Sequence, residues 1–381
     1  MSYNPASSNN TITLQENPAY LQEQLITYIG NKRSLLGFIG QGISIVQKEL
    51  KKEKLSVFDC FSGSGVVARY CRQFAKEMWV NDLERYSAVI NSCYQTNKEE
   101  ADTEELRQLH KTLTRQLEEC PLEPGFISKH YAPADDTSIQ PGERCFYTTR
   151  NARFLDTACK LIDQQVPPHL QAYFLAPLLS QASIHANTSG VFKGFYKNKE
   201  GLGQFGGTGR DALQRIAAPI TLPYPVFSNF SCQVEVLQKE AQTAAEQLPP
   251  LDLAYLDPPY NQHPYGSNYF MLNLLATGRL PAADDLSPIS GIPKNWNRSH
   301  YNKARYIKQA LERLIATIPA SFLLISFNSE GFIKPDEMES LLTAQGKIQR
   351  LECNYNTFRG SRNLQNRNIH VTEYLYVVDK R

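Results

Sequence analysis

The sequence predicts an α/β fold with a doubly wound, mostly parallel sheet, because strand-like and helix-like segments alternate along it. Residues 55–61 are apolar and β-prone and end in a glycine turn, and residues 66–74 follow with helical spacing. A second strand is expected over residues 77–80 and a second helix over residues 86–97. A strand, turn and helix that recur at intervals of roughly 20 residues are typical of parallel strands joined by helices.

The stretch from residue 100 to about residue 230 interrupts this rhythm. Helical spacing appears over residues 106–117, 152–164 and 170–186, and a glycine-rich segment with aromatic and basic side chains follows over residues 189–209. We interpret this region as an insertion into the α/β domain. Sheet-like runs return after it, at residues 232–236, 252–256, 321–327, 348–355 and 371–378.

Length and composition predict a folded chain with one large core and a subdomain. The chain has 381 residues, of which 41% are hydrophobic and 20% are charged. Its eight cysteines show neither the paired spacing of a zinc site nor a disulfide framework, so we expect no metal and reduced thiols. The N-terminal residues lack the pattern of a signal peptide, and no run reaches the roughly 18 apolar residues of a membrane span. We therefore expect a cytoplasmic protein without a membrane segment.

Charge is balanced over the whole chain but not along it. The net charge is only +2, from 40 basic and 38 acidic residues. Residues 294–313 nevertheless contain one acid among several cations, so this stretch could face phosphates, although a solvated helix face is the alternative interpretation. The cations are Lys294, Arg298, Lys303, Arg305, Lys308 and Arg313.

Residues 59–65, with the sequence Asp-Cys-Phe-Ser-Gly-Ser-Gly, join a strand end to a glycine turn. Gly63 and Gly65 allow the backbone to turn tightly and to approach a ligand at the start of a helix. Asp82 follows the next strand, where a carboxylate can accept hydrogen bonds from both hydroxyls of an adenosine ribose. Ala68 is tolerated at the third glycine position of a dinucleotide fingerprint. These residues alone therefore leave a nicotinamide cofactor, another nucleotide or a structural turn as alternatives.

The segment Asp257-Pro258-Pro259-Tyr260 directly follows the apolar strand 251–256. Prolines have a fixed φ and no amide hydrogen, so the segment is rigid and its carbonyls are free to accept hydrogen bonds. If the Asp257 carboxylate and the Pro258 carbonyl each accept one hydrogen of an adenine amine, the nitrogen can direct its lone pair at a sulfonium methyl carbon. Asp257 can then take the released proton, and Tyr260 can stack on an extruded base. A rigid turn with a capping aspartate is the structural alternative.

Together these motifs resemble those of the alpha-group (Dam-like) adenine-specific DNA methyltransferases of restriction-modification systems. The resemblance covers most of residues 25–378, and residues 261–270 are similar to the type IIS-like subgroup. It implies a Rossmann-like class I methyltransferase fold with an antiparallel C-terminal strand and an inserted, mainly helical target-recognition region. It also implies that S-adenosylmethionine is the methyl donor. The matching motifs are Tyr28-Ile-Gly-Asn-Lys32, residues 61–65, Asn81-Asp82 and residues 257–260.

The resemblance and the motifs together give a set of expected site residues. By family similarity, Tyr28 and Lys32 lie near the methionine end of the cofactor, where the Lys32 cation can meet its carboxylate, and Asp59 lies near its amino group. Phe61 could pack against the adenosine or the sulfonium. The expected cofactor-binding residues are Tyr28, Gly30, Asn31, Lys32, Asp59, Phe61, Ser62, Gly63, Gly65, Asp82 and Asp257; the expected catalytic residues are Asp257, Pro258, Pro259 and Tyr260.

The expected domain division follows the same motifs. Residues 1–20 are a flexible arm, residues 21–100 the cofactor-binding half, residues 101–230 the target-recognition region and residues 231–381 the catalytic half. Within the inserted region, basic side chains alternate with aromatic ones, so we expect this segment to follow a DNA backbone and to fill the gap left by an extruded base. The expected DNA-binding residues are Lys193, Lys197, Lys199, Arg210, Lys294, Arg298, Lys303, Arg305, Arg359 and Arg362.

The sequence thus predicts a site-specific methyltransferase that acts on the 6-amino nitrogen of adenine in double-stranded DNA. A cytosine-amine DNA methyltransferase or an RNA methyltransferase of the same fold remains an alternative, but those families more often have Ser or Asn at the position of Asp257. A nicotinamide-dependent oxidoreductase would give residues 257–260 no role, and a DNA-binding module without activity would not need the cofactor motifs. We expect any restriction endonuclease activity to belong to a separate chain.

Overall fold

The computed structural model describes residues 15–22, 25–207, 209–260, 262–278, 280–356 and 370–381. Its centre is a seven-stranded sheet with the strand order β3-β2-β1-β4-β5-β7-β6. All neighbours are parallel except for β7, which runs antiparallel to both β5 and β6. The predicted doubly wound sheet with an antiparallel C-terminal strand is confirmed. The strands are β1 (Leu55–Asp59), β2 (Ala75–Asn81), β3 (Gln233–Leu237), β4 (Leu251–Leu256), β5 (Ala320–Asn328), β6 (Lys347–Asn356) and β7 (His370–Asp379).

The central strands are buried throughout because helices cover both faces of the sheet. Every residue of β1 and β4 is buried, and successive side chains enter different cores. Val57 packs with α2 (Leu36–Leu50) and α3 (Val66–Cys71) on one face. Phe58 packs on the other face, where the covering helices are α11 (Ala241–Ala245), α14 (Ala304–Thr317) and α15 (Pro335–Thr343).

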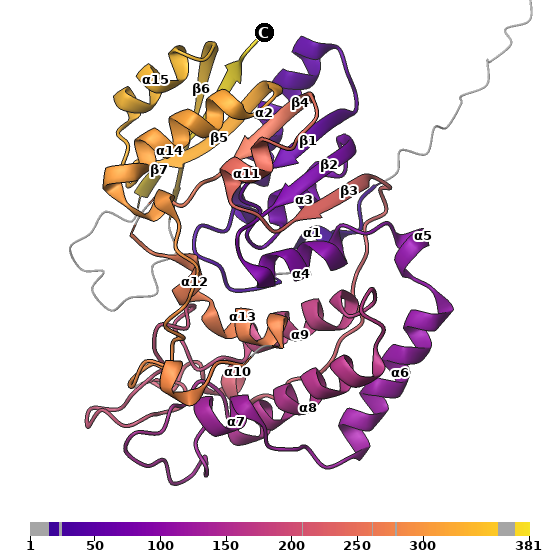
Figure 1. Cartoon of the computed structure of the whole chain (residues 1–381), viewed down its shortest axis with the longest axis vertical. Helices are drawn as coiled ribbons and strands as arrows, with labels where there is room; N and C mark the ends of the chain where they lie inside the picture. Colours follow the sequence, from indigo (N-terminus) through magenta and orange to yellow (C-terminus); the bar gives the residue numbers. More distant parts are fainter. Residues whose placement is uncertain (1–14, 23–24, 208, 261, 279, 357–369) are drawn as a thin grey trace, which may run out of the picture.

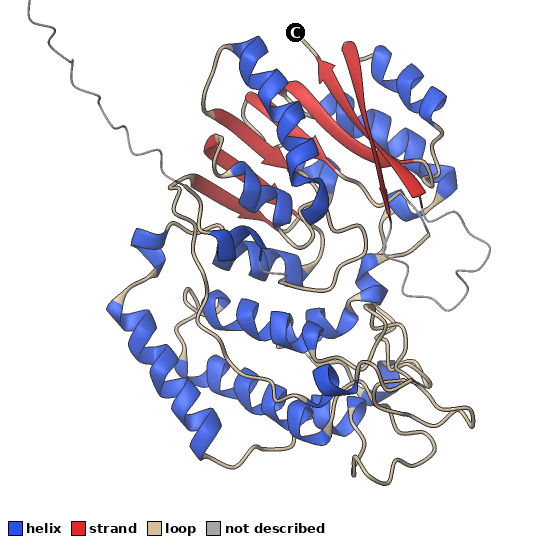
Figure 2. Ribbon diagram, turned by 180° about the vertical axis from the view of Figure 1, so that it is seen from behind, coloured by secondary structure: helices blue, strands red, loops and turns tan. Residues whose placement is uncertain are grey.

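A layer of helices lies beyond one end of the sheet, as Figures 1 and 2 show. α4 (Arg85–Tyr94) follows β2 directly, but its buried side chains belong to the core of this layer, where it contacts α9 and α13. The other main helices of the layer are α6 (Glu104–Glu119), α7 (Phe126–Tyr131), α8 (Thr149–Gln165), α9 (Ala172–Ile184), α10 (Leu213–Ala217) and α13 (Phe270–Thr277).

The helical layer comes from two separate stretches of the chain. One is the predicted insertion, and the other begins after β4, where α13 packs its apolar side chains against α4 and α9. Part of the region that sequence reasoning assigned to the catalytic half thus packs with the helices of the insertion. The short elements are α1 (Pro18–Gln22), η1 (Arg33–Leu35), α5 (Lys98–Ala101), α12 (Tyr265–Asn268), η2 (Ala283–Asp285) and η3 (His300–Asn302). None of the helices in the described part of the chain is long and apolar enough to cross a membrane.

Candidate active site

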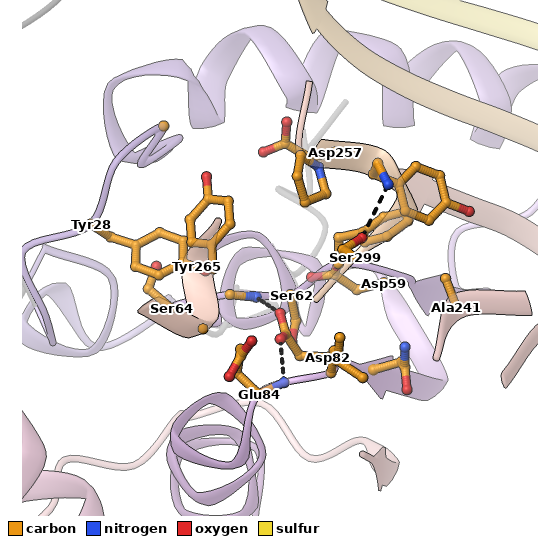
Figure 3. Close-up of a pocket in the computed structure, with 18 of the residues that line it drawn as sticks. Tyr28, Asp59, Ser62, Ser64, Asp82, Glu84, Ala241, Asp257, Tyr265 and Ser299 are labelled. Atoms are coloured by element: carbon orange, nitrogen blue, oxygen red, sulfur yellow. Dashed lines mark hydrogen bonds between the residues drawn. The ribbon is translucent and has the colours of Figure 1, made fainter. Parts of the chain in front are cut away.

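A pocket opens where β1, β2 and β4 end, between the sheet and the helical layer (Figure 3). The register explains its position: Asp59 of β1 pairs with Val80 of β2 and Tyr255 of β4, so the residues that follow these strands reach the same edge. The structure brings together all the expected cofactor residues except Gly65, and Pro259 joins them. The pocket lining includes Tyr28, Gly30, Asn31, Lys32, Asp59, Phe61, Ser62, Gly63, Asp82, Asp257 and Pro259.

The glycine turn after β1 requires glycine at two positions. Gly63 and Gly65 have φ angles of 52° and 74°, in the left-handed region that favours glycine. A Cβ on Gly63 would lie 2.6 Å from the Tyr28 ring, and a Cβ on Gly65 would lie 2.5 Å from the Asn91 side-chain oxygen. Gly65, the one expected cofactor residue outside the lining, serves as the N-cap of α3.

Asp82 is fixed by backbone groups and keeps lone pairs for a ligand. The amide of Gly63 donates to its Oδ2 at 2.8 Å, and the amide of Glu84 donates to its Oδ1 at 2.8 Å (Figure 3). Each carboxylate oxygen has more than one lone pair. Both oxygens can therefore accept a further hydrogen bond, which suits the two hydroxyls of a ribose.

Asp59 offers the pocket a carboxyl group that has no cationic partner among the described residues. It is buried, and the backbone amides of Phe61 and Ala68 are its polar neighbours. Burial raises the pKa of Asp59 well above its ordinary value, and the nearby charges of Asp257 and Asp82 raise it further. A buried carboxylate of this kind is stabilised by a cationic partner, so the site fits a ligand with an ammonium group.

Asp257 and Lys32 form an ion pair in the pocket. The Lys32 Nζ lies 3.1 Å from Oδ1 of Asp257 and 3.0 Å from Oε1 of Glu373, on β7. Burial raises the pKa of Asp257 to about 6, with Lys32 opposing the shift and Glu373 adding to it. Burial disfavours the charge of Lys32, but the two carboxylates outweigh that effect and raise its pKa above the ordinary value. The ammonium thus has two protein partners already, and its contact with a cofactor carboxylate stays a prediction.

Comparison with known proteins identifies the family to which this chain belongs. A family model described as D12 class N6 adenine-specific DNA methyltransferase matches residues 28–313, well over half of the chain. The chain belongs to this family of methyltransferases. The resemblance inferred from the motifs is confirmed, and so are the activity class and the choice of adenine.

Several restriction-modification methyltransferases are similar over nearly the whole length of this methyltransferase. The type II methyltransferase M.NlaIII of Neisseria lactamica is 27% identical over 93% of this chain and 99% of its own. M.CviAII of Paramecium bursaria Chlorella virus 1 is 26% identical over 93% of this chain and 98% of its own. M.FokI of Planomicrobium okeanokoites is 24% identical over 93% of this chain but only 52% of its own, so the methyltransferase spans about half of that longer relative.

In this methyltransferase, four tyrosines hold the N-terminal motif against the loop that follows β4. The Tyr28 ring stacks on Tyr265 and Tyr269 with centroids 5.0 and 4.9 Å apart, and its hydroxyl lies 3.2 Å from that of Tyr86. Tyr269 accepts a hydrogen bond from the amide of Ile29, and Tyr265 donates one to the Ile29 carbonyl. Sequence reasoning matched the segment 261–270 to the family and assigned Tyr28 to the cofactor, but it gave Tyr86, Tyr265 and Tyr269 no role.

Glu84 is a further acid in the pocket, and sequence reasoning missed it. Its Oε2 accepts hydrogen bonds from the side-chain amides of Asn273 at 2.5 Å and Asn297 at 3.1 Å. Burial raises its pKa to about 7, and the charge of Asp82 contributes to the shift. The signal in the sequence was an acid two residues after Asp82, at the strand end.

Tyr260 and Phe61 each make an aromatic contact near the site. The Tyr260 ring packs on Phe327 with centroids 5.3 Å apart and lies 5.6 Å from the Lys32 ammonium. Tyr260 is partly exposed and Pro258 is buried, and the pocket lining includes neither of these two expected catalytic residues. Phe61 meets Tyr301 edge-on at 5.0 Å, so the segment around η3 covers this side of the pocket.

The expected DNA-binding residues fall into three groups. Lys193, Lys197, Lys199 and Arg210 are exposed on loops of the helical layer. Lys294, Lys303 and Arg305 are exposed on the segment after α13, where the Lys294 ammonium donates to the Asp284 carbonyl at 2.8 Å. Arg298 lines the pocket at the ends of β1, β2 and β4 and lies over the Trp296 ring at 4.4 Å. Arg359 and Arg362 lie outside the described residues, as does Arg367.

Proposed function

We propose that this methyltransferase binds S-adenosylmethionine in the pocket at the ends of β1, β2 and β4 and methylates an adenine that has been extruded from duplex DNA. The observation that carries the proposal is that Asp59, Asp82 and Asp257 line one pocket, although they lie at the ends of three different strands. Asp82 would hold the ribose hydroxyls and Asp59 the ammonium of the methionine part. The bound cofactor supplies an electrophilic methyl carbon.

Asp257 would position the adenine amine and take its proton. Its carboxylate accepts a hydrogen bond from the amine, which localises the nitrogen lone pair, and it removes one proton from the nitrogen after the N–C bond has formed. Only the ionised carboxyl can do this. With the pKa of Asp257 near 6, the rate should fall as the pH drops through that value, because protonation removes the acceptor.

The DNA would lie along the basic loops that flank the pocket. The amide of Phe192 donates to the Asn268 carbonyl at 2.7 Å, so the loop that carries Lys193 and Lys197 is tied to α12, just after the catalytic loop. We propose residues 101–230 as the larger part of the target-recognition region. A separate chain would supply any partner endonuclease.

Two substitutions separate catalysis from cofactor binding. We expect Asp257→Ala to lower the single-turnover rate by at least roughly 100-fold while the cofactor still binds, because the acceptor and base are lost. We expect Asp82→Ala to weaken cofactor binding by about tenfold or more, because a carboxylate that receives two hydroxyls is lost. The measurements are single-turnover transfer of labelled methyl groups to DNA and calorimetric titration with S-adenosylmethionine.

The matched control is Asp336→Ala, at an exposed position in the first turn of α15. It should behave as the unchanged protein in both assays. Digestion of the labelled DNA to nucleosides should give labelled N6-methyl-2′-deoxyadenosine. Wild-type turnover by Asp257→Ala would overturn the catalytic assignment, and failure of the unchanged protein to bind S-adenosylmethionine would overturn the cofactor assignment.

A further inference from the structure

Glu373 is a buried acid in an otherwise largely apolar stretch of strand. It lies on β7, next to Tyr374 and Leu375, and its side chain is 1% exposed. Its Oε1 accepts a hydrogen bond from Ser326 Oγ of β5 at 2.5 Å and lies 3.0 Å from the Lys32 ammonium. Burying a carboxylate is costly unless it has a specific partner, so this position is determined by its contacts and not by packing alone.

Lys32 connects Glu373 to the catalytic loop. Its side chain is only 3% exposed, and its ammonium lies between the Glu373 carboxylate and Oδ1 of Asp257. The Asp257 side chain is more accessible, at 17%. One ammonium therefore joins a fully enclosed carboxylate to one that can meet a substrate. Successive polar contacts therefore connect Ser326, Glu373, Lys32 and Asp257, in that order. These residues come from β5, β7, the N-terminal motif and the loop after β4.

We propose that Glu373 is a positioning residue for methyl transfer: it holds the Lys32 ammonium against Oδ1 of Asp257 and so leaves Oδ2 for the adenine amine. This inference rests on the proposed catalytic role of Asp257. It gives Lys32 a function toward the catalytic carboxylate. A lysine side chain has several rotatable bonds, and a second anchor fixes its end in one place.

The two partners act on Asp257 in opposite directions. The positive charge of Lys32 lowers the pKa of Asp257, whereas the negative charge of Glu373 raises it. The other titratable groups that interact with Asp257 are Asp59, Tyr255 and Tyr265. Burial raises the pKa of both tyrosines, so they stay neutral in the pH range of the assay. Removing Glu373 and removing Lys32 should therefore move the pH dependence of the reaction in opposite directions.

The test compares Glu373→Gln with Glu373→Ala and Lys32→Met in single-turnover transfer from pH 5 to pH 9. Glutamine keeps an oxygen that can accept from Lys32 but loses the charge. We expect Glu373→Gln to lower the plateau rate by roughly 10-fold. We also expect the acid limb, which is the fall in rate at low pH, to move to lower pH. Glu373→Ala loses the anchor and should lower the plateau by roughly 100-fold. Lys32→Met should move the acid limb to higher pH. Affinity for S-adenosylmethionine should change less than twofold in both Glu373 variants.

The control is Glu352→Gln, at an exposed position on the neighbouring strand β6, and it should leave rate and pH profile unchanged. A Glu373→Gln protein with the wild-type plateau and acid limb would overturn the proposal, even if the alanine variant does not fold. A lower plateau with an unmoved acid limb would also overturn it, since a merely structural role predicts that result. Asp257→Asn separates the two hypotheses: if it transfers methyl groups normally, the proposed function itself fails.

Discussion

Four of the carboxyl groups that line the pocket have a raised pKa. Burial is the largest cause for Asp59, Asp82, Glu84 and Asp257, and repulsion among them adds to it for Asp59 and Glu84. Within the described residues, the Lys32 ammonium offsets the negative charge of Asp257 and of Glu373 directly. This group of acids thus favours a ligand with positive charge, and S-adenosylmethionine carries both a sulfonium and an ammonium group. If these residues bind the donor as proposed, they also select for its charge.

Glu84→Gln tests this charge balance through stability. The pKa of Glu84 is about 7 in the folded protein and ordinarily 4.5, so ionising it costs folding free energy as the pH rises from 4.5 to 7. Below 4.5 the carboxyl is neutral in both states and the cost vanishes. Glutamine keeps an acceptor for Asn273 and Asn297 without the charge. We expect the variant to gain about 1–2 kcal/mol more stability at pH 8 than at pH 5.5, measured by urea unfolding.

An exposed acid provides the comparison for this prediction. Glu337→Gln in the first turn of α15 should show no pH-dependent gain, since its side chain is half exposed. Equal stabilisation of Glu84→Gln at both pH values would mean that the Glu84 charge is not the cause. A loss of stability at pH 8 would show that the ionised carboxyl is the favoured form.

Elements that are specified locally could be predicted from the sequence. The apolar run before Asp59, the glycine turn and the segment 257–260 each carry their own signal within a few residues, and together they place Asp59, Asp82 and Asp257 at one sheet edge. Glu373 could not be placed in this way. Glu373 contacts Lys32 because β7 pairs antiparallel with β5, and this pairing joins residues far apart in the sequence. The only signal in the sequence is an acid within an apolar strand, which does not identify its partner. The same holds for Tyr269, which reaches Tyr28 only after α12 and the N-terminal motif have packed together.

The glycine turn is the element most sensitive to a single methyl group. Gly63→Ala places a Cβ at a φ of 52° and within 2.6 Å of the Tyr28 ring, which itself stacks on Tyr265 and Tyr269. We expect a loss of about 1–3 kcal/mol of stability and at least roughly tenfold weaker cofactor binding, since the turn must move from the ligand. Urea unfolding and calorimetric titration measure the two effects.

Gly37→Ala in α2 is the matched substitution. A Cβ there meets no atom within 4 Å and the position is helical, so alanine should stabilise the protein by about 0.5–1 kcal/mol without affecting the cofactor. If Gly63→Ala behaved like Gly37→Ala, the turn would not be as tightly packed as the structure shows.

At the scale of the whole molecule, the sheet holds the cofactor motifs and the helical layer presents the basic loops. α4 joins the two parts, since it follows β2 in the chain and packs with α9 and α13. The buried side chain of Asn187 stabilises the loop that carries Lys193, Lys197 and Lys199. Its amide donates hydrogen bonds to the carbonyls of Cys145 and Gln204. A fixed loop next to the catalytic segment can set the register of DNA relative to the active site.

Replacing Lys193, Lys197 and Lys199 together by alanine tests whether this loop contacts DNA. Each lysine that neutralises a phosphate contributes about 0.9 to the slope of log affinity against log salt, so the slope should fall by about 2–3 and binding should weaken equally for all DNA sequences. The transfer rate at saturating DNA should hold, because no pocket residue changes. Lys76→Ala, an exposed lysine at the start of β2, should leave the slope unaltered. An unaltered slope in the triple variant would place the DNA on another surface, since these ammonium groups would then release no counterions.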